Sequence, residues 1–267
     1  MRKRYLYILI IFILTSNLFS AVIISRHELG IVTKELYHQN RFAEIHDDRI
    51  VSIWDFNQNE LTLINHYLRV YATINFDDFK IQLQMQNRAH IQSQINELGT
   101  ERIQMMSGAT LGLFNQIRAG FILVDTLDVS GFKAFEFHVY NTNILAQKLW
   151  ISPDLQKRID REVQPEKIKA VEAIFKSNRD EYLRAMMIRL DPISSVVEDI
   201  EEVGYVVRRV DYGLRSAPNP EFEAEADKLA GFVNDVVVMA IDSEIFNFHK
   251  IYKQVSFLEY QVLTTGD

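Results

Sequence analysis

A change of hydrophobic period close to residue 75 constrains the fold of this chain more than any other feature. From about Leu29 to Ile74, strands are indicated by enrichment in Thr, Val, Ile and aromatic residues, interrupted by Asn and Asp. This composition is typical of an antiparallel meander. After Asn75 the chain is rich in Gln, and apolar residues recur at helical spacing up to Gly99, which predicts a helix that ends there.

The same switch between strand and helix patterns occurs again in the rest of the chain. The next predicted elements are a less regular helix over 101–117, a strand over 121–129, a hairpin with strands 132–140 and 144–151, a helix from Pro165 to Asp191, a shorter helix from Ile193 to Gly204 and a strand over 204–213. Residues 221–241 fit a helix at their start and a strand at their end. Helices inserted between runs of strands indicate an α+β fold built on one sheet. Since no linker divides the chain, we expect residues 22–267 to form a single domain.

The N-terminus predicts export from the cytoplasm. The basic residues 2–4 precede an apolar core over residues 6–14, and small residues follow up to Ala21. This is the layout of a secretory signal peptide spanning residues 1–21. The alternative is an uncleaved helix that runs through Ile24 and anchors the protein in the inner membrane, because about 20 residues span a bilayer. In both cases the bulk of the chain is exported, and we expect a periplasmic protein.

The composition excludes several classes of protein. The chain contains no cysteine, which excludes a disulfide scaffold, a cysteine-ligated zinc site and a lipid-modified N-terminal cysteine. The formal charge of −7 becomes −10 when the three basic residues of the segment 1–21 are removed, since that segment contains no acid. No basic run is interleaved with aromatic residues, so we expect no nucleic-acid partner. The negative charge also disfavours binding to an anionic membrane surface.

No motif for catalysis or metal binding is present in the sequence. The seven histidines form neither an H-x-H pair nor an H-E-x-x-H motif, so we expect no metal site. There is no G-x-S-x-G elbow, no thiol and no phosphate-binding glycine loop, which disfavours hydrolase and nucleotide chemistry. The acidic cluster of Asp191, Glu198, Asp199, Glu201 and Glu202 is interpreted as a solvated helix face rather than paired catalytic carboxylates. We therefore expect a non-enzymatic protein without a cofactor.

Three stretches carry a resemblance to a known family. Residues 48–74 (DRIVSIWDFNQNELTLINHYLRVYATI) form a pair of strands followed by a third. Residues 124–155 contain a Gly-aromatic pair, an alternating strand, a polar turn and a strand ending in Trp150. Residues 204–213 (GYVVRRVDYG) form a Gly-Tyr strand, with Val206 where the family often has Pro. In these places the chain resembles a family of secreted bacterial proteins of unknown function that is assigned to the LolA/LolB-like fold.

The resemblance implies a particular architecture and a class of ligand. It implies a curved antiparallel sheet, a LolA-like half-barrel, in which inserted helices cover one face. LolA and LolB carry lipoprotein acyl chains, so the analogy of fold implies a lipid or lipoprotein acyl chain as the ligand. The chain departs from the family in its Gln-rich helix after Asn75 and its long helix after Pro165, which are larger than the usual inserts.

Four aromatic residues on predicted strands are the candidate ligand-lining residues: Trp54, Phe135, Phe137 and Trp150. Such residues form a core beneath the helices, or they line an apolar cavity that a curved sheet leaves partly uncovered. The first interpretation fits a structural or interaction module with a filled core and an acidic surface that meets an envelope protein partner. The second fits a periplasmic carrier or sensor of an apolar molecule.

The position of Trp150 links the fold to these hypotheses. Strand alternation predicts that Ala146 and Lys148 lie on the same side of the sheet as Trp150, with Leu149 on the other side. A lysine two residues before the tryptophan indicates that this side is not deep core. We therefore expect Trp150 near the mouth of the sheet, partly covered by the helix that starts after Pro153.

Overall fold

One sheet of twelve strands forms the centre of the protein in the computed structural model, which describes residues 20–114, 117–188, 192–213 and 217–265. The strands are β1 (Ser20–Glu28), β2 (Ile31–His38), β3 (Arg41–His46), β4 (Arg49–Asp55), β5 (Glu60–Asn65), β6 (Val70–Asn75), β7 (Ala119–Val129), β8 (Phe132–Asn141), β9 (Ile144–Ser152), β10 (Tyr205–Asp211), β11 (Phe232–Ala240) and β12 (Lys253–Gln254). The helices are α2 (Phe76–Leu98), α3 (Thr100–Phe114), α4 (Pro153–Ile159), α5 (Pro165–Ala185), α6 (Pro192–Glu201), α7 (Pro220–Leu229) and α8 (Phe257–Thr265), with the 3-10 helix η1 (Ser243–Ile251).

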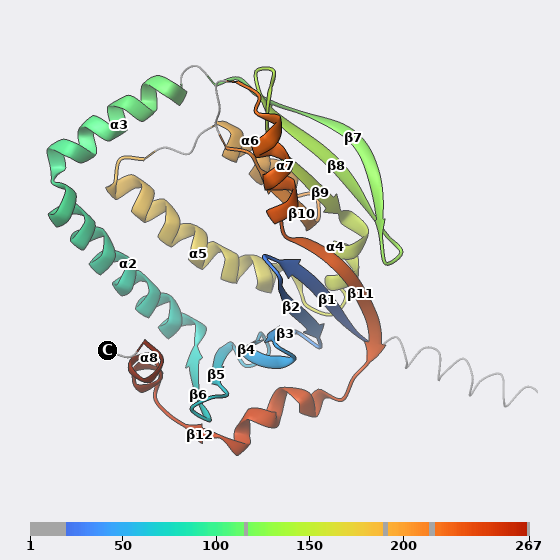
Figure 1. The fold of residues 1–267 in the computed structure, drawn as a ribbon. Coiled ribbons are helices and arrows are strands. Elements are labelled where there is room, and N and C mark those ends of the chain that lie inside the picture. The colour runs from blue at the N-terminus through green and yellow to red at the C-terminus, as the bar shows by residue number, and fades with distance from the viewer. Residues whose placement is uncertain (1–19, 115–116, 189–191, 214–216, 266–267) are drawn as a thin grey trace, which may run out of the picture.

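The strands lie side by side in the order β12-β6-β5-β4-β3-β2-β1-β11-β10-β9-β8-β7. Neighbouring strands are antiparallel, except that the short β12 runs parallel to β6. Figure 1 shows the sheet as an arc from β7 through β11 and β1 to β6, with α5 lying across the space inside the arc. The predicted α+β fold with a curved antiparallel sheet and inserted helices is therefore confirmed.

β1 occupies the middle of the sheet. Val22 pairs with Tyr37 of β2 on one side and with Val238 of β11 on the other. Ala21, Val22 and Ile24 are fully buried, because residues in the centre of a sheet covered on both faces contact neighbours in every direction. The sequence did not predict this strand, since its apolar residues continue the pattern of the expected signal peptide.

The export signal lies mostly outside the described residues. Residues 1–19 lie outside the described ranges. The last two residues of the expected signal peptide, Ser20 and Ala21, are the first two residues of β1. Within the described ranges, no helix is both long enough and apolar enough to cross a membrane. The signal peptide and the alternative membrane anchor both stay predictions.

The largest core cluster lies on one face of the sheet, which we call the inner face. It includes Val22 and Tyr37 from the first strands and Trp150 from β9, and Trp54 of β4 packs against it. The helices α2, α4, α5 and α7 contribute Phe76, Leu155, Ile159, Ile168, Val171, Ala226 and Ala230 to the same cluster or to its edge. Phe257 of α8 also packs at the edge of this cluster, so five of the described helices lie on the inner face.

Two further helices pack on the opposite face, which we call the outer face. Ile193, Val197 and Ile200 of α6 form a cluster with residues of β8 and β9. Phe246 of η1 joins a second cluster with Leu36 of β2 and residues of β1, β3, β4 and β5. Helices were predicted to cover one face of the sheet, and in the structure helices also cover parts of the outer face.

The tip of the β7–β8 hairpin closes back onto β11. The Ser130 hydroxyl donates to Asp235 Oδ1 at 2.9 Å and accepts from the Val236 backbone N–H at 3.1 Å. By contrast, the described residues of β10 and β11 pair only at Arg208 and Phe232. The hairpin tip therefore adds side-chain hydrogen bonds to β11, whose backbone pairing with β10 is short.

A buried polar cluster fixes the start of β1 to α4. The Ser20 hydroxyl donates to Glu162 Oε1 at 3.0 Å, and Arg158 Nη1 donates to the same oxygen at 2.8 Å. Arg158 also donates to the Ser20 hydroxyl. His38 Nδ1 lies 3.2 Å from the Ser20 carbonyl oxygen. Because each buried charge has a partner of opposite sign, the cluster is compatible with a dry interior.

Most predicted elements are confirmed, and several boundaries move. α2 begins after Asn75, whose side chain accepts from the Asp77 N–H, and it ends at Gly99 with a φ of 76°. Residues 221–241 contain both of the candidate structures, because α7 is followed by β11. The helix predicted to reach Asp191 ends at Ala185. The helix expected after Pro153 is α4, whereas η1, β12 and α8 were not predicted.

The junction between β10 and α4 generates a stability prediction. A Cβ atom on Gly204 would lie 2.7 Å from the backbone nitrogen of Pro153, closer than real side chains approach. We expect Gly204→Ala to lower the free energy of unfolding by about 1–3 kcal/mol, as overpacking does. Urea denaturation measures the change. Gly120→Ala is the matched control, since its Cβ has no neighbour within 4 Å; equal midpoints for the two variants would contradict the prediction.

Candidate functional site

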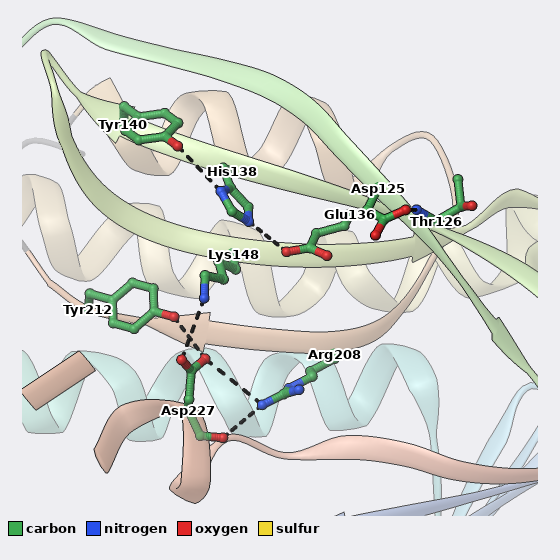
Figure 2. A network of polar contacts seen from close by, with 9 residues as sticks. All are labelled: Asp125, Thr126, Glu136, His138, Tyr140, Lys148, Arg208, Tyr212 and Asp227. Carbon is green, nitrogen blue, oxygen red and sulfur yellow. Dashed lines mark hydrogen bonds and ion pairs between the residues drawn. The ribbon is translucent and has the colours of Figure 1, made fainter. Parts of the chain in front are cut away.

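Polar side chains gather on the inner face of β8, β9 and β10, beside α7 (Figure 2). Strand register brings them together, because directly paired residues project from the same face of a sheet. His138 lies opposite Lys148, and Trp150 lies opposite both Glu136 and Arg208. Three separate strands therefore present charged groups around one buried tryptophan.

Asp227 of α7 reaches across to these strands. Its Oδ1 accepts from the Tyr212 hydroxyl at 2.8 Å, and its Oδ2 lies 3.5 Å from Lys148 Nζ. Arg208 Nη2 donates to the Asp227 carbonyl at 2.7 Å and lies 4.0 Å from Oδ1. We call Lys148, Arg208, Tyr212 and Asp227 the Asp227 cluster. Two cations and one phenol thus converge on a single carboxylate (Figure 2).

Aromatic rings hold the two cations in place. The guanidinium carbon of Arg208 lies 4.9 Å from the ring centroid of Trp150, and Lys148 Nζ lies 5.4 Å from that of Tyr212. At such distances the negative face of the ring attracts the cation. Trp150 is 7% exposed. Its buried indole ring is thus an apolar surface that the Arg208 guanidinium covers.

One donor of the cluster lacks a partner within the described chain, and the phenol of the cluster has a raised pKa. Arg208 Nε is buried and has no hydrogen-bond partner among the described residues, although buried donors are normally satisfied. Burial, together with the hydrogen bond to the Asp227 carboxylate, raises the pKa of Tyr212 above its ordinary value. Like any tyrosine, Tyr212 is protonated at neutral pH, and the raised pKa keeps it a donor under more alkaline conditions as well.

A second chain of polar contacts lies on β8 itself. His138 Nε2 lies 2.6 Å from Glu136 Oε1, and His138 Nδ1 lies 3.3 Å from the Tyr140 hydroxyl. All three side chains are half-buried and share the face of Lys148. Glu136 is thereby engaged by His138, and Asp227 is the carboxylate that faces Lys148 and Arg208 (Figure 2).

A third polar group joins the first strands to β10. Arg26 Nη2 donates to the Tyr205 hydroxyl at 3.0 Å and to the Val206 carbonyl at 2.9 Å. Tyr205 and Tyr37 donate to Glu35 Oε2 at 2.6 and 2.8 Å. Burial, followed by the nearby Glu35 carboxylate, raises the pKa of Tyr205. Since these groups satisfy one another, we interpret them as structural.

The four aromatic residues selected from the sequence do not share one surface. Trp54 and Trp150 lie on the inner face, at opposite parts of the sheet, on β4 and β9. Phe137 packs on the outer face with α6. Phe135 lies opposite Ile151, a residue of the same outer cluster. Whether any of the four contacts a ligand stays a prediction.

Trp150 is more deeply buried than the sequence predicted. It belongs to the inner core cluster together with Leu155 of α4, and the Arg208 guanidinium covers its ring. Ala146 lies on the outer face with Leu149 rather than beside Trp150. The reason is an irregularity in the β8–β9 register near Ala146, where an extra residue reverses the alternation.

The Asp227 cluster was not recognised from the sequence. Lys148 was noted only for its effect on Trp150, and Arg208 and Tyr212 lie in the stretch GYVVRRVDYG that carries the resemblance. Asp227 lies 79 residues after Lys148. A single sequence contains no signal for such a contact, which requires the path of the chain between β10 and α7.

Neither a group of metal-binding side chains nor a similarity to known proteins points to a function. Within the part of the chain that the structure describes, no three His, Cys, Asp or Glu residues are grouped to hold a metal ion. The acidic residues near the end of α6 pair with cations, Glu198 with Lys176 and Arg179, and Glu201 with Arg209. Comparison with protein-family models, curated proteins and solved structures found no match to this chain.

The burial of Trp150 leads to a prediction on stability. Trp150→Ala removes a buried ring and the surface on which Arg208 rests. We expect the free energy of unfolding to fall by about 3–5 kcal/mol, as for other large-to-small core changes. Trp150→Phe, which keeps a ring beneath the guanidinium, should lose clearly less. A loss below about 1 kcal/mol for Trp150→Ala, measured by chemical denaturation, would mean that the ring is not core.

Proposed function

We propose that the protein is a non-catalytic periplasmic carrier or sensor that binds an apolar chain, such as the acyl chain of a lipid or lipoprotein, on the inner face of its sheet. The observation that carries this proposal is that the side chains of α5 are only partly covered by the rest of the protein. Among the described side chains of this 21-residue helix, only Asn178 is buried. Phe175 is 45% exposed although its ring lies 6.2 Å from that of Trp54.

The way in which α2 and α5 meet supports the same proposal. Asn87 Nδ2 donates to the Asn178 carbonyl at 2.9 Å, and Arg88 Nε lies 3.1 Å from Glu181 Oε1. The groove between the two helices is lined largely by charged and polar residues. At their other end the helices contact each other through Phe79 and Phe175, whose ring centroids lie 6.1 Å apart beside Trp54. The apolar side chains of the two helices are therefore gathered at that end, where they face the sheet and a ligand.

The surroundings of Trp54 have the chemistry of an apolar site with a polar handle. Its ring centroid lies 5.8 Å from that of Phe76, 5.7 Å from Phe79 and 6.2 Å from Phe175. Its indole N–H is buried, and no hydrogen-bond acceptor for it occurs among the described residues. A buried indole normally finds an acceptor. A bound ligand that reaches Trp54 with an oxygen acceptor, such as an ester group, would supply one.

The resemblance to secreted proteins of the LolA/LolB-like fold enters the proposal here. The curved antiparallel sheet with helices on its inner face is the architecture that the resemblance implies. Membership of that family, and the acyl chain as ligand, are proposed on the resemblance and on the apolar inner face together. Fold alone does not decide function, so the ligand requires a direct test.

The test is binding of an apolar probe by protein purified without detergent. Native mass spectrometry and lipid extraction detect a carried ligand, and a fluorescent fatty acid measures the affinity. We expect Phe175→Glu to weaken binding at least tenfold, because it places a charge in an apolar site at a cost of about 1.4 kcal/mol or more. Phe121→Glu, at a phenylalanine of similar exposure on β7, is the matched control. A protein that carries nothing and does not bind the probe would exclude the proposal.

A second candidate function, an interaction module of the cell envelope, is favoured by β7. This strand ends the described sheet, with β8 as its partner on one side. Its consecutive residues Phe121, Ile122, Leu123 and Val124 are each between 48 and 56% exposed. A long apolar edge strand is a template for strand addition. The partner that fits is an extended apolar segment of an envelope protein.

Photo-crosslinking in the periplasm tests this candidate. A photoreactive amino acid at Leu123 should crosslink to a defined protein, and Phe121→Glu should abolish that product, since a charge at the edge opposes pairing. The same crosslinker at Leu258 of α8, which is also exposed, is the control. Identical products from both positions, or a product unaffected by Phe121→Glu, would exclude β7 as the interaction site.

A further inference from the structure

Asp227 occupies the centre of a site that is otherwise positive. Lys148 and Arg208 contribute two charges, and Tyr212 contributes a hydroxyl donor, while the Asp227 carboxylate accepts from or pairs with all three. Glu136, the next carboxylate on this face, is engaged by His138. Without the Asp227 carboxylate, Lys148, Arg208 and Tyr212 would present three donors, with Glu223 of the same helix as the remaining carboxylate near Tyr212.

The carboxylate is supplied by a helix that is lightly held. All ten residues of α7 are described, and none of them is buried. Ala226 and Ala230, the residues around its C-terminal end that pack against the inner core, have small side chains. The polar contacts of Asp227 join the helix to β9 and β10 (Figure 2). Its carboxylate can therefore leave the site at small cost in buried apolar area.

We propose that Lys148, Arg208 and Tyr212 form a binding site for the anionic head group of an amphipathic ligand, a carboxylate or a phosphate, and that Asp227 occupies this site when no ligand is bound. This inference rests on the proposed binding of an apolar chain and assigns the polar end of that ligand. The ligand class is a fatty acid or an anionic phospholipid, not a neutral lipid.

The donor geometry fits an incoming anion better than it fits Asp227. The Tyr212 hydroxyl is at hydrogen-bond distance from the carboxylate, whereas Lys148 Nζ is at 3.5 Å and Arg208 Nη2 at 4.0 Å. Charge-assisted hydrogen bonds are shorter than this, at about 2.7–2.9 Å. Arg208 Nε is in addition buried without a partner in the described part of the chain. A free anion is not tethered to a helix and can approach all of these donors.

The apolar surroundings supply a path for the tail. Trp150 lies directly beneath the Arg208 guanidinium. The partly buried Phe132 and Leu145 pack against the same inner core cluster, so part of their apolar surface is open to a ligand. Trp54 packs against the other part of that cluster. An amphipathic molecule with its head group at Lys148 would therefore extend its chain over the inner face.

Fluorescence of Trp150 provides a local measurement. The chain has two tryptophans, so in a Trp54→Phe background the signal comes from Trp150 alone. The probes are oleate, oleyl alcohol, which has the same tail without the charge, and inorganic phosphate, which has the charge without the tail. We expect oleate to bind about tenfold or more tightly than oleyl alcohol, because charge-assisted bonds are worth about 1.5–3 kcal/mol.

Variants of the cluster separate the head-group site from the apolar site. Asp227→Ala should tighten oleate binding about tenfold, because it removes the competing carboxylate, and should leave oleyl alcohol binding unchanged. Lys148→Gln combined with Arg208→Gln should abolish the preference for oleate. Asp227→Asn, which keeps the shape without the charge, controls for a general opening of α7. Circular dichroism verifies that each variant is folded.

The outcomes distinguish the inference from the proposed function. Equal affinities for oleate and oleyl alcohol in every variant would overturn the anionic site while leaving apolar binding intact. A response of Trp150 to phosphate in Asp227→Ala, without binding of either oleyl compound, would support the anionic site and exclude the apolar one. A silent Trp150 with all three probes, together with no binding of the fluorescent fatty acid by the unaltered protein, would overturn both.

Discussion

The position of β1 between β2 and β11 is the constraint on which the rest of the structure depends. The meander β2–β6 joins the later strands through β1, since the chain leaves β6 into helices and returns to the sheet only at β7. Polar contacts fix β1 at both ends, through Ser20 with Glu162 and through Arg26 with Tyr205. Both use partners far away in sequence, so β1 determines how the two groups of strands face the same helices.

The elements with a strong local pattern could be predicted from the sequence, because hydrophobic period is a local signal. The hairpin around Thr142 and the long helix after Asn75 are examples. β1 could not be predicted, because Ala21, Val22 and Ile24 continue the apolar run of an export signal. Only pairing with Tyr37 and Val238, which the sequence does not encode locally, shows that these residues form a strand.

The candidate site was less predictable than the fold for a related reason. Aromatic residues were selected by residue type, and alternation then assigned Ala146 to the same side of the sheet as Trp150. One irregularity near Ala146 reversed part of that assignment, because a single extra residue changes the side of every residue beyond it. The contact between Lys148 and Asp227 depends on three strands and a helix. Such tertiary contacts can be obtained only from the folded chain.

The inner face is chemically divided, and this division bears on its function. Around Trp54 the neighbours are the rings of Phe76, Phe79 and Phe175. Around Trp150 the neighbours include a guanidinium, held in turn by Asp227. A core built only for stability gains little from ionic groups beside its aromatic residues, because desolvation of the charges offsets their attraction. A surface that binds a molecule with an apolar chain and a charged end needs both environments on one continuous face, and this sheet provides them on the strands that β1 holds together.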